Sequence, residues 1–415
     1  MSRFVLTAMP FSGHVTPVLA VAATLAARDH DVRVYTGSRF RAKVEGVGAR
    51  FVPWQVAPDF DENDLPSVFP RVTETPGLRQ LMINMEDVFV ATAPDQVMDL
   101  RREWEREPWD VLVSEETSVG PGLFARTNGC RWATLTVTML NLQSRQGPPP
   151  GLALKPGRTP IGRARDAALR FLVPLMARPL RAPVDRARAA VGLGPADGVY
   201  DTQVFSPELI LAGGVAALDH DRTDRPGHLH WVGALRPPVG RHTALPRWWD
   251  DLTGRPVVHV TQGTQNVELT DLIRPTLEAL AEEDVIVVAT TGRAGHDELP
   301  FPVPANTRVA GFVPHDLLLP RTDVMVTNGG WGGVLAALSH GVPMVIGGAN
   351  LDKPGVAVCA AAVCAAIDLR TRRPSAHTIL DAVQRVADPS ASFRERARQL
   401  QADLGRGGGA DRAAA

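Results

Sequence analysis

The sequence lacks most features of a secreted or membrane-embedded protein. Its 415 residues include only three cysteines, and no run of eighteen or more apolar residues occurs. An odd, small number of cysteines cannot build a disulfide framework, and short apolar runs cannot span a bilayer. The first apolar stretch is broken by Pro10, Gly13 and Pro17, which is typical of a strand and not of a signal peptide. We therefore expect a cytoplasmic protein.

An excess of either charge is also absent. The 44 Lys and Arg residues balance 45 Asp and Glu residues, which leaves a formal net charge of −1. This balance gives no general attraction to nucleic acid or to anionic lipid. No Gly-x-Gly-x-x-Gly turn follows the first expected strand, which disfavours a nicotinamide dehydrogenase. With 44% hydrophobic residues, the chain is predicted to be globular, with two or three domains.

Short apolar runs alternate with helix-like segments, which predicts parallel sheets with crossover helices. We expect strands at residues 4–9, 31–36, 109–114 and 132–138, and again at 257–261, 285–289, 307–309 and 324–327. A Pro-containing stretch separates the two series. The fold class is therefore α/β, with two doubly wound, Rossmann-like domains facing a cleft. The predicted divisions are an N-terminal domain at 1–232, a linker at 233–255, a second domain at 256–390, and a C-terminal helix with a frayed tail at 391–415.

A glycine-rich turn between an apolar run and an Ala- and Leu-rich helix is the most distinctive motif. It contains Gly329, Gly330, Gly332 and Gly333. Glycines leave the backbone N–H groups at the helix start accessible, and these groups suit a phosphate. The motif predicts a site for a phosphorylated small molecule, and the alternative is a tight turn that requires positive φ.

His14 follows the first expected strand, and we place it on a loop at the carboxyl end of that strand. Imidazole titrates near neutral pH and is the commonest general base in enzymes. The alternative is a histidine that caps the following helix.

Several short motifs in the second half of the chain carry a family resemblance. They are Thr261-Gln262-Gly263-Thr264, Gly311-Phe312-Val313-Pro314-His315, Thr327-Asn328-Gly329-Gly330 and Asp352-Lys353-Pro354. In this order, and together with the Gly-His-x-x-Pro loop of His14, they resemble the nucleotide-sugar-dependent glycosyltransferases of the GT-B fold. The likeness is to the bacterial natural-product branch, which is related to the UDP-glycosyltransferases, and it covers nearly the whole chain.

The resemblance implies an enzyme that inverts the anomeric centre, acts on a small-molecule donor and a small hydrophobic acceptor, and uses no cofactor or metal ion. His14 matches the catalytic base of the family, which is paired with an aspartate after a later strand. Glu115 stands at that position here, and Glu116 is the alternative partner. A carboxylate would fix the tautomer of the imidazole and stabilise its protonated form. Both glutamates could instead be surface carboxylates at a strand end.

The resemblance also implies which residues bind the donor. Phe312 falls where many relatives stack a tryptophan on the nucleobase, although a phenylalanine suits a core equally well. Asn328 replaces a histidine, and Ala336 stands where UDP-using relatives often carry a glutamate, which leaves dTDP open beside UDP. The implied nucleotide-binding residues are Gly263, Thr264, Phe312, Val313, Asn328, Gly329, Gly330, Gly332 and Gly333, and the sugar-binding residues are Asp352 and Lys353.

The acceptor is expected against the first domain, where proline-rich segments at residues 53–76 and 146–160 would wall its pocket. The candidate acceptor-binding residues are Phe11, Ser12, Met82 and Met85. The identity of the acceptor and the oligomeric state stay open, a homodimer included.

Two alternatives to this function remain at this point. Residues 158–188 contain eight arginines interleaved with apolar residues, so the enzyme could lie on a membrane and use a lipid-linked acceptor. The alternative for this segment is a solvated helix over the acceptor pocket. The departures at Glu115, Asn328 and Lys353 would also fit a protein that binds a nucleotide sugar without turning it over.

Overall fold

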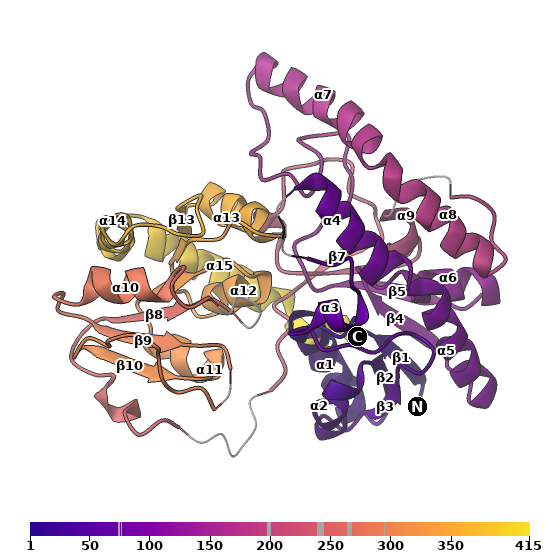
Figure 1. Cartoon of the computed structure of the whole chain (residues 1–415), viewed down its shortest axis with the longest axis horizontal. Coiled ribbons are helices and arrows are strands. Elements are labelled where there is room, and N and C mark those ends of the chain that lie inside the picture. Colours follow the sequence, from indigo (N-terminus) through magenta and orange to yellow (C-terminus); the bar gives the residue numbers. More distant parts are fainter. Residues whose placement is uncertain (74, 76, 197–200, 239–244, 264–267, 294) are drawn as a thin grey trace.

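The computed structural model describes the chain from residue 1 to 415 except positions 74, 76, 197–200, 239–244, 264–267 and 294 (Figure 1). In the described residues the chain forms two lobes, each built on a twisted sheet of parallel strands covered by helices. The predicted α/β architecture of two doubly wound domains is confirmed.

The first lobe holds a seven-stranded sheet in the order β3-β2-β1-β4-β5-β6-β7. Its strands are β1 (Arg3–Thr7), β2 (Asp31–Thr36), β3 (Arg50–Pro53), β4 (Val111–Glu115), β5 (Trp132–Thr136), β6 (Ile210–Gly213) and β7 (Leu229–Gly233). Its helices are α1 (Ser12–Ala27), α2 (Arg41–Gly46), α3 (Leu65–Val68), α4 (Leu78–Met85), α5 (Ala93–Arg106), α6 (Val119–Asn128), α7 (Pro160–Met176), α8 (Arg181–Ala190) and α9 (Asp201–Val204), with short turns η1 (Ser38–Phe40), η2 (Glu86–Val90), η3 (Arg178–Leu180) and η4 (Ala216–Leu218).

The second lobe holds a six-stranded sheet in the order β10-β9-β8-β11-β12-β13. Its strands are β8 (Val257–Thr261), β9 (Ile286–Thr290), β10 (Thr307–Ala310), β11 (Val324–Thr327), β12 (Met344–Ile346) and β13 (Ala366–Asp368). Its helices are α10 (Ile273–Leu280), α11 (His315–Leu318), α12 (Trp331–Ser339), α13 (Lys353–Ala362), α14 (Ala376–Ala387), α15 (Phe393–Gly407) and α16 (Gly409–Ala413), with turns η5 (Trp249–Asp251) and η6 (Leu319–Arg321).

The strands are buried on both faces because helices cover both sides of each sheet. Successive residues of β1 show this: Val5 belongs to the core on one face of the sheet, and Leu6 belongs to the core on the other. In β11, Met325 and Val326 divide in the same way. Side chains alternate across a strand, so a nearly continuous apolar run is what a doubly covered parallel strand requires.

The lobes are in direct contact at glycines. A Cβ atom on Gly355 of α13 would lie 2.9 Å from Cε of Met139, and one on Gly214 would lie 2.9 Å from the ring of Trp331. The loop after β5 therefore contacts the first turn of α13, and the loop after β6 contacts the first turn of α12. The carboxyl ends of the first sheet therefore face the helix starts of the second lobe.

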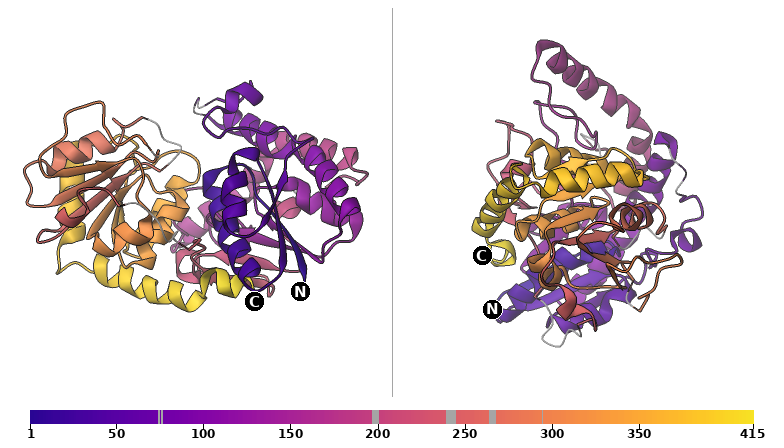
Figure 2. Two further views of the ribbon diagram at one scale, coloured as in Figure 1. Left: turned by 90° about the horizontal axis from the view of Figure 1, so that it is seen from below. Right: turned by 90° about the vertical axis from the view of Figure 1, so that its left-hand side faces the viewer.

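The C-terminal segment is helical almost throughout, up to Ala413, so the prediction of a frayed tail from Gly405 is wrong. Helix α15 packs against α12 of the second lobe and β7 of the first, and α16 packs against α1. Arg28 at the end of α1 donates to the backbone carbonyls of Ala414 at 3.0 Å and Asp411 at 3.1 Å. In the left view of Figure 2, α15 runs along the lower side of both lobes, and the C-terminus lies beside the N-terminus.

Candidate active site

The predicted base does not lie on a loop. Helix α1 begins at Ser12, so His14 lies in its first turn, directly after β1. The start of α1 is held by a distant side chain, because Glu62 accepts from the backbone N–H of Ser12 at 3.0 Å and from its hydroxyl. The helix start therefore supports His14, whose side chain keeps 17% of its surface exposed.

Glu115, the last residue of β4, is the partner of His14. Its carboxylate is fully buried, and its Oε1 lies 3.4 Å from Nδ1 of the imidazole. Four further donors fix this carboxylate: the backbone N–H groups of Met9 (3.1 Å) and Thr117 (2.7 Å), and the hydroxyls of Thr117 (2.7 Å) and Ser118 (3.3 Å). It is a buried, hydrogen-bonded group and not a surface carboxylate.

The hydrogen bonds select one tautomer of His14. The Thr117 oxygen also lies 3.1 Å from Nδ1 of His14, and its single hydrogen is directed to Glu115. Because Thr117 has no second hydrogen to give, Nδ1 carries a hydrogen and donates it to Thr117 and Glu115. The other ring nitrogen, Nε2, is left without a hydrogen in the neutral ring, as a general base requires.

The surroundings move the pKa of both partners in the directions expected of a charged pair. Burial lowers the pKa of His14, but the charge and hydrogen bond of Glu115 outweigh it, so the pKa stands above 6.5. Burial raises the pKa of Glu115, whereas His14 and the Thr117 hydrogen bonds bring it below its usual range. The imidazolium form is thus stabilised when His14 accepts a proton.

Glu116 points away from this pair. Its buried carboxylate accepts from the backbone N–H groups of Val137 (2.8 Å) and Thr138 (2.7 Å) and from the Thr138 hydroxyl (2.7 Å), all directly after β5. Burial and the neighbouring charge of Glu115 raise the pKa of Glu116 to about 7. Between the two alternatives, Glu115 contacts the histidine and Glu116 holds the loop that follows β5.

In the second lobe the glycine-rich turn joins β11 to α12. Gly329 has φ = 85°, and a Cβ atom there would lie 2.7 Å from Cγ2 of Ile346, so the position excludes larger residues. Gly330 is the N-cap of α12, and no side chain of the described residues caps this helix. Gly332 is exposed, with no described atom within 4 Å of its Cβ position. Among the described residues, no side chain therefore occupies the first N–H groups of α12, which leaves the phosphate prediction open at this helix start.

The loop after β8 lies beside this turn. The Asn328 amide donates to the backbone carbonyl of Gln262, and the Cβ position of Gly263 lies 3.6 Å from the Asn328 amide nitrogen. Gln262 in turn accepts from the backbone N–H groups of Leu272 and Ile273, each at 2.9 Å, at the start of α10. Asn328 is thus 6% exposed and braces two loops at the strand ends. The predicted residue Thr264 lies outside the described residues.

Phe312 and Val313, predicted to hold the nucleobase, differ in exposure. Val313 is buried in a small core with Leu318 and Val288, so only its backbone can reach a ligand. Phe312 is 60% exposed on the loop between β10 and α11, so the alternative that it belongs to the core is wrong. An exposed ring beside a strand end is available for stacking.

The predicted sugar-binding pair opens α13 and faces the first lobe. Asp352 is the N-cap of this helix and Lys353 its first residue, and both are half-buried. Burial raises the pKa of Asp352, while the charges of Lys353 and His14 act in the opposite direction. The charge of Asp352 likewise contributes to the raised pKa of His14. The two predicted half-sites therefore lie within electrostatic reach of each other across the lobes.

Two of the predicted acceptor residues, Phe11 and Ser12, lie at the start of α1, and the other two lie on α4. Phe11 is the N-cap of α1, and its ring centroid lies 5.3 Å from that of His14, 5.2 Å from that of Phe60 and 6.0 Å from that of Phe89. Ser12 binds Glu62, as described above. Met82 and Met85 lie on α4, a helix without a buried residue, and are half-buried. The sequence indicated neither Glu62 nor Thr117 as part of the site.

Each Asp-x-Asp string has a carboxylate that is paired with an arginine. Asp59 accepts from the backbone N–H of Ser38 at 3.0 Å, and Asp61 pairs with Arg39. Asp219 pairs with Arg222. Across the described part of the chain, no group of three or more His, Cys, Asp and Glu side chains is arranged to hold a metal ion.

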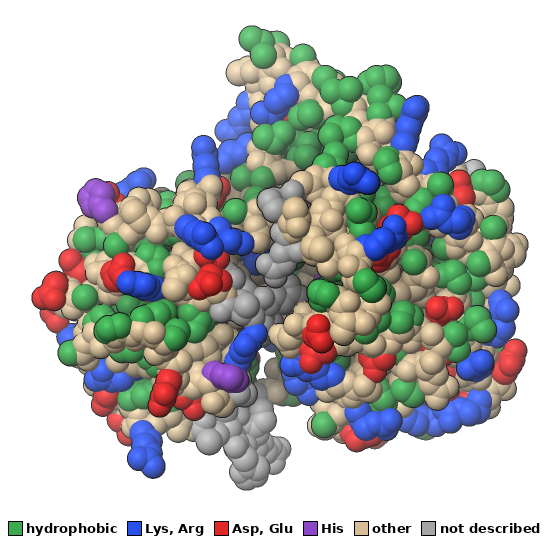
Figure 3. All heavy atoms as spheres, viewed as in Figure 1, with side chains coloured by type: hydrophobic (Ala, Val, Ile, Leu, Met, Phe, Trp, Pro, Cys, Tyr) green, Lys and Arg blue, Asp and Glu red, His purple; other side chains and the backbone are tan. Residues whose placement is uncertain are grey.

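The arginine-rich segment forms α7, η3 and α8. Helix α7 projects from the first lobe, and in the described residues it buries only Asp166. Figure 3 shows hydrophobic and basic side chains together on this part of the surface. Its exposed apolar residues are Ile161, Phe171, Leu172 and Met176. No helix of the described residues is long and apolar enough to cross a membrane.

Comparisons with known proteins identify relatives over nearly the whole chain. Residues 274–406 match the model of the erythromycin biosynthesis protein CIII-like C-terminal domain. The chain is 39% identical over 403 residues to 4'-demethylrebeccamycin synthase of Lentzea aerocolonigenes, covering 96% of this chain and 95% of that protein. It is 32% identical to UDP-glucosyltransferase A1 of Starmerella bombicola, covering 95% and 87%.

Solved structures share the fold over the whole length. The glycotransferase of kitacinnamycin superposes with a TM-score of 0.74 at 21% identity, covering 100% of this chain and 98% of that one. The calicheamicin glycosyltransferase CalG4 gives a TM-score of 0.71 at 20% identity, covering 100% and 96%. At this identity the likeness concerns the fold alone.

Proposed function

The chain belongs to the GT-B glycosyltransferases of natural-product biosynthesis, and from this premise we propose its reaction. It transfers a sugar from UDP-sugar or dTDP-sugar to a hydroxyl group of a hydrophobic aglycone, inverts the anomeric centre and needs no metal ion. The observation that carries the proposal is the His14–Glu115 pair, which lies within electrostatic reach of Asp352 on the other lobe.

His14 acts as the general base. The Nε2 atom takes the proton of the acceptor hydroxyl while the hydroxyl oxygen forms a bond to the anomeric carbon of the sugar. The bond from that carbon to the diphosphate oxygen breaks at the same time, and the nucleoside diphosphate leaves with the electron pair. Glu115 stabilises the imidazolium that results, since its buried carboxylate accepts from Nδ1.

The start of α12 stabilises the leaving diphosphate. Its uncapped N–H groups and the positive end of the helix dipole face the charge that develops as the bond breaks. Because these groups are fixed by the backbone, they need no reorganisation during the reaction. Asp352 accepts hydrogen bonds from sugar hydroxyls. The base and the diphosphate site belong to opposite lobes, which favours attack from the face opposite the leaving group and therefore inversion.

Metal-free catalysis has a physical basis in this arrangement. Arg39 pairs with Asp61 and Arg222 pairs with Asp219, one carboxylate of each Asp-x-Asp string, and the helix start supplies the positive potential that a cation would otherwise supply. The choice between UDP and dTDP is left open by Ala336, which is buried and carries no polar group for the ribose.

The test is a transfer assay with the full chain. UDP-glucose and dTDP-glucose are offered with a panel of hydroxylated aromatic aglycones, in the presence and absence of EDTA, and the anomeric configuration of the product is read by NMR. We expect a β-linked product from the α-linked donor and the same rate with EDTA. An α-linked product, or a loss of rate that Mg²⁺ restores, would contradict the mechanism.

Helix α7 supports a second candidate, a peripheral membrane enzyme with a lipid-linked acceptor. Its exposed Phe171 and Met176 accompany arginines on the same helix, a combination that binds anionic membrane surfaces. Flotation with phosphatidylglycerol vesicles separates the two candidates, since only the membrane enzyme should float with them.

A further inference from the structure

Glu116 is a buried acidic residue that the proposed reaction does not use. It directly follows Glu115, the last residue of β4, and is only 4% exposed. One carboxylate oxygen accepts from the backbone N–H of Val137 at 2.8 Å. The other accepts from the backbone N–H and the hydroxyl of Thr138, each at 2.7 Å. Glu116 therefore fixes the first two residues after β5.

The strength of these hydrogen bonds depends on the charge of Glu116. The donors of Val137 and Thr138 favour the ionised carboxylate, whereas burial and the charge of Glu115 act against it and raise the pKa of Glu116 to about 7. Above this pH the carboxylate is ionised, and hydrogen bonds to an ionised acceptor are the strong ones. His14 also faces this charge, because Glu116 contributes to the raised pKa of His14.

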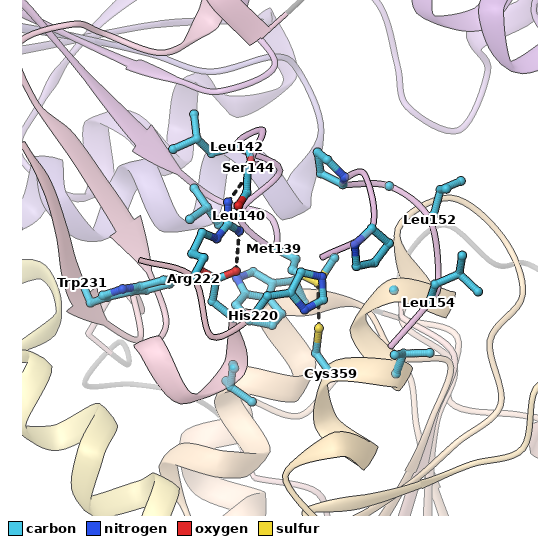
Figure 4. Close-up of a pocket in the computed structure, with 18 residues that line it drawn as sticks. Met139, Leu140, Leu142, Ser144, Leu152, Leu154, His220, Arg222, Trp231 and Cys359 are labelled. Atoms are coloured by element: carbon cyan, nitrogen blue, oxygen red, sulfur yellow. Dashed lines mark hydrogen bonds and ion pairs between the residues drawn. The ribbon is translucent and has the colours of Figure 1, made fainter. Parts of the chain in front are cut away.

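The next residue, Met139, contacts the second lobe. Its half-buried side chain packs against the apolar core that contains Val334 of α12 and Val356 of α13. The thiol of Cys359 donates to Sδ of Met139 at 3.4 Å, and a Cβ atom on Gly355 would lie 2.9 Å from its Cε atom. Figure 4 shows Met139 beside Cys359 of α13. Gly355 and Cys359 are four residues apart in the helix, so Met139 contacts a single face of α13.

This contact lies at the start of the helix that carries the expected sugar-binding residues. Asp352 is the N-cap of α13, and Gly355 is its third residue. The start of α12, where the diphosphate is expected, has a different contact with the first lobe, between Trp331 and Gly214. Met139 therefore contacts the sugar half of the donor site, and the diphosphate half has a contact of its own.

We propose that Glu116 is a positioning residue for the donor sugar, which holds the loop after β5 so that Met139 keeps the start of α13 and its Asp352 in place opposite His14. The proposal rests on the transfer reaction proposed above and deepens it. Between β5 and α7 the described chain forms no helix or strand, so no regular backbone ladder fixes Met139. Glu115 orients the base and Glu116 acts on the sugar site through Met139.

The first test separates sugar binding from nucleotide binding. Glu116→Gln keeps the shape but has one acceptor oxygen instead of two, so either Val137 or Thr138 loses its acceptor. Calorimetry at about pH 8, where Glu116 is ionised, gives the Kd of UDP-glucose and of UDP, with dTDP-glucose and dTDP in parallel. We expect the Kd of the nucleotide sugar to rise about tenfold and that of the nucleoside diphosphate to stay within about twofold. Equal weakening of both ligands, or of neither, would contradict the proposal.

The second test asks whether Met139 transmits the effect. Met139→Ala removes the contact with α13, so it should weaken UDP-glucose as Glu116→Gln does. If both residues act through one contact, the double variant should stay within about twofold of the weaker single variant. Additive losses would show that Glu116 acts by another route and would overturn the proposal.

Asp99→Asn is the matched control. Asp99 is also a buried carboxylate, and it accepts from the backbone N–H groups of Gln55, Val56 and Ala57 at 3.0, 2.9 and 3.2 Å. The variant makes the same exchange of carboxylate for amide at another loop of the first lobe, so the Kd of UDP-glucose should not change. An equal loss in Asp99→Asn would mean that any damage to the first lobe weakens the donor, which excludes a specific role for Glu116.

Cys359 reports on the same contact without a substrate. Its thiol is 9% exposed beside Met139, and burial raises its pKa to about 11, so it should react slowly with N-ethylmaleimide. Glu116→Gln should raise the modification rate of Cys359, measured by peptide mass spectrometry, and leave that of the buried Cys130 unchanged. If the wild-type chain binds no nucleotide sugar, the proposed reaction fails. An unchanged rate at Cys359 overturns the positioning role of Glu116 independently of that result.

Discussion

The two lobes build their halves of the site from different parts of the polypeptide. The first lobe uses ionisable side chains, with His14 held by Glu115 and Thr117 in a largely buried network. The second lobe offers backbone N–H groups at Gly329 to Gly333, where every residue except the buried Trp331 is a glycine. The first half is therefore sensitive to pH and to any change of its side chains. The second half should be insensitive to pH but should not tolerate a side chain at Gly329, where a Cβ atom would meet Ile346.

The largest effect is expected for His14→Ala. Removal of a general base lowers the rate by about 10²–10⁴-fold, while the backbone site for the diphosphate is untouched. Transfer kinetics and calorimetric binding of UDP and dTDP measure the two parts separately. Thr16→Ala, an exposed position on the same helix, is the control. A His14→Ala variant with a normal transfer rate would show that the first lobe does not supply the catalytic base.

Glu115→Gln should reduce the transfer rate less, by about 10- to 100-fold. Glu115 stabilises the protonated form of His14, and each pKa unit by which this stabilisation falls lowers the rate by about a factor of ten. Its pH dependence is more informative. Glu115 raises the pKa of His14, and the base must be unprotonated, so the rate rises with pH through this raised pKa. Without the charge the pKa of His14 falls, and the acidic limb of the profile of kcat/KM against pH moves to lower pH. A stationary limb would show that the two groups are not coupled.

In the second lobe, Gly329→Ala should weaken nucleotide binding about tenfold through backbone strain at φ = 85° and the contact with Ile346. The acidic limb of the pH profile should not move. Gly192→Ala is a matched control, since Gly192 has φ = 84° but no atom near its Cβ position. Nucleotide titration by calorimetry gives both values. A shifted pH limb with unchanged nucleotide affinity would contradict the division of roles.

The smallest effect is expected for Gly332→Ser. The Cβ position meets no described atom within 4 Å, so the melting temperature should not change. The added hydroxyl faces the same space as the N–H groups and should tighten nucleotide binding by about two- to threefold, the value of a weak net hydrogen bond. Thermal melting and nucleotide titration measure both. A weakened affinity would mean that the backbone of Gly332 lies too close to the ligand for any side chain.

The sequence predicted those parts of the fold that depend on local pattern. The strands β2, β8 and β11 have the predicted bounds, because most residues of each are β-branched or aromatic. Strands β6 and β7 were not predicted, since they are short and end in glycine. The start of α1 was misjudged because Glu62, fifty residues away, binds Ser12, and sequence spacing does not reveal such a contact.

The sequence predicted which residues belong to the site, but it did not predict which of these residues contact one another. The motifs indicated both halves, whereas the choice between Glu115 and Glu116 depended on which face of the strand end each side chain takes. The bridging position of Thr117 and the pairing of Asp219 with Arg222 depend on the packing of loops. No periodicity marks such loops, so their side chains became candidates only in the folded molecule.

The C-terminal helices limit how the lobes can move. The polypeptide passes from the first lobe to the second after β7, and α15 and α16 bring it back to β7 and α1. Two lobes that are joined by one segment can rotate about any axis. Two lobes that are joined by two neighbouring segments rotate about the line between these segments. We therefore expect any opening and closing of the lobes to follow one rotation, so that each approach returns the imidazole of His14 to the same place opposite Asp352.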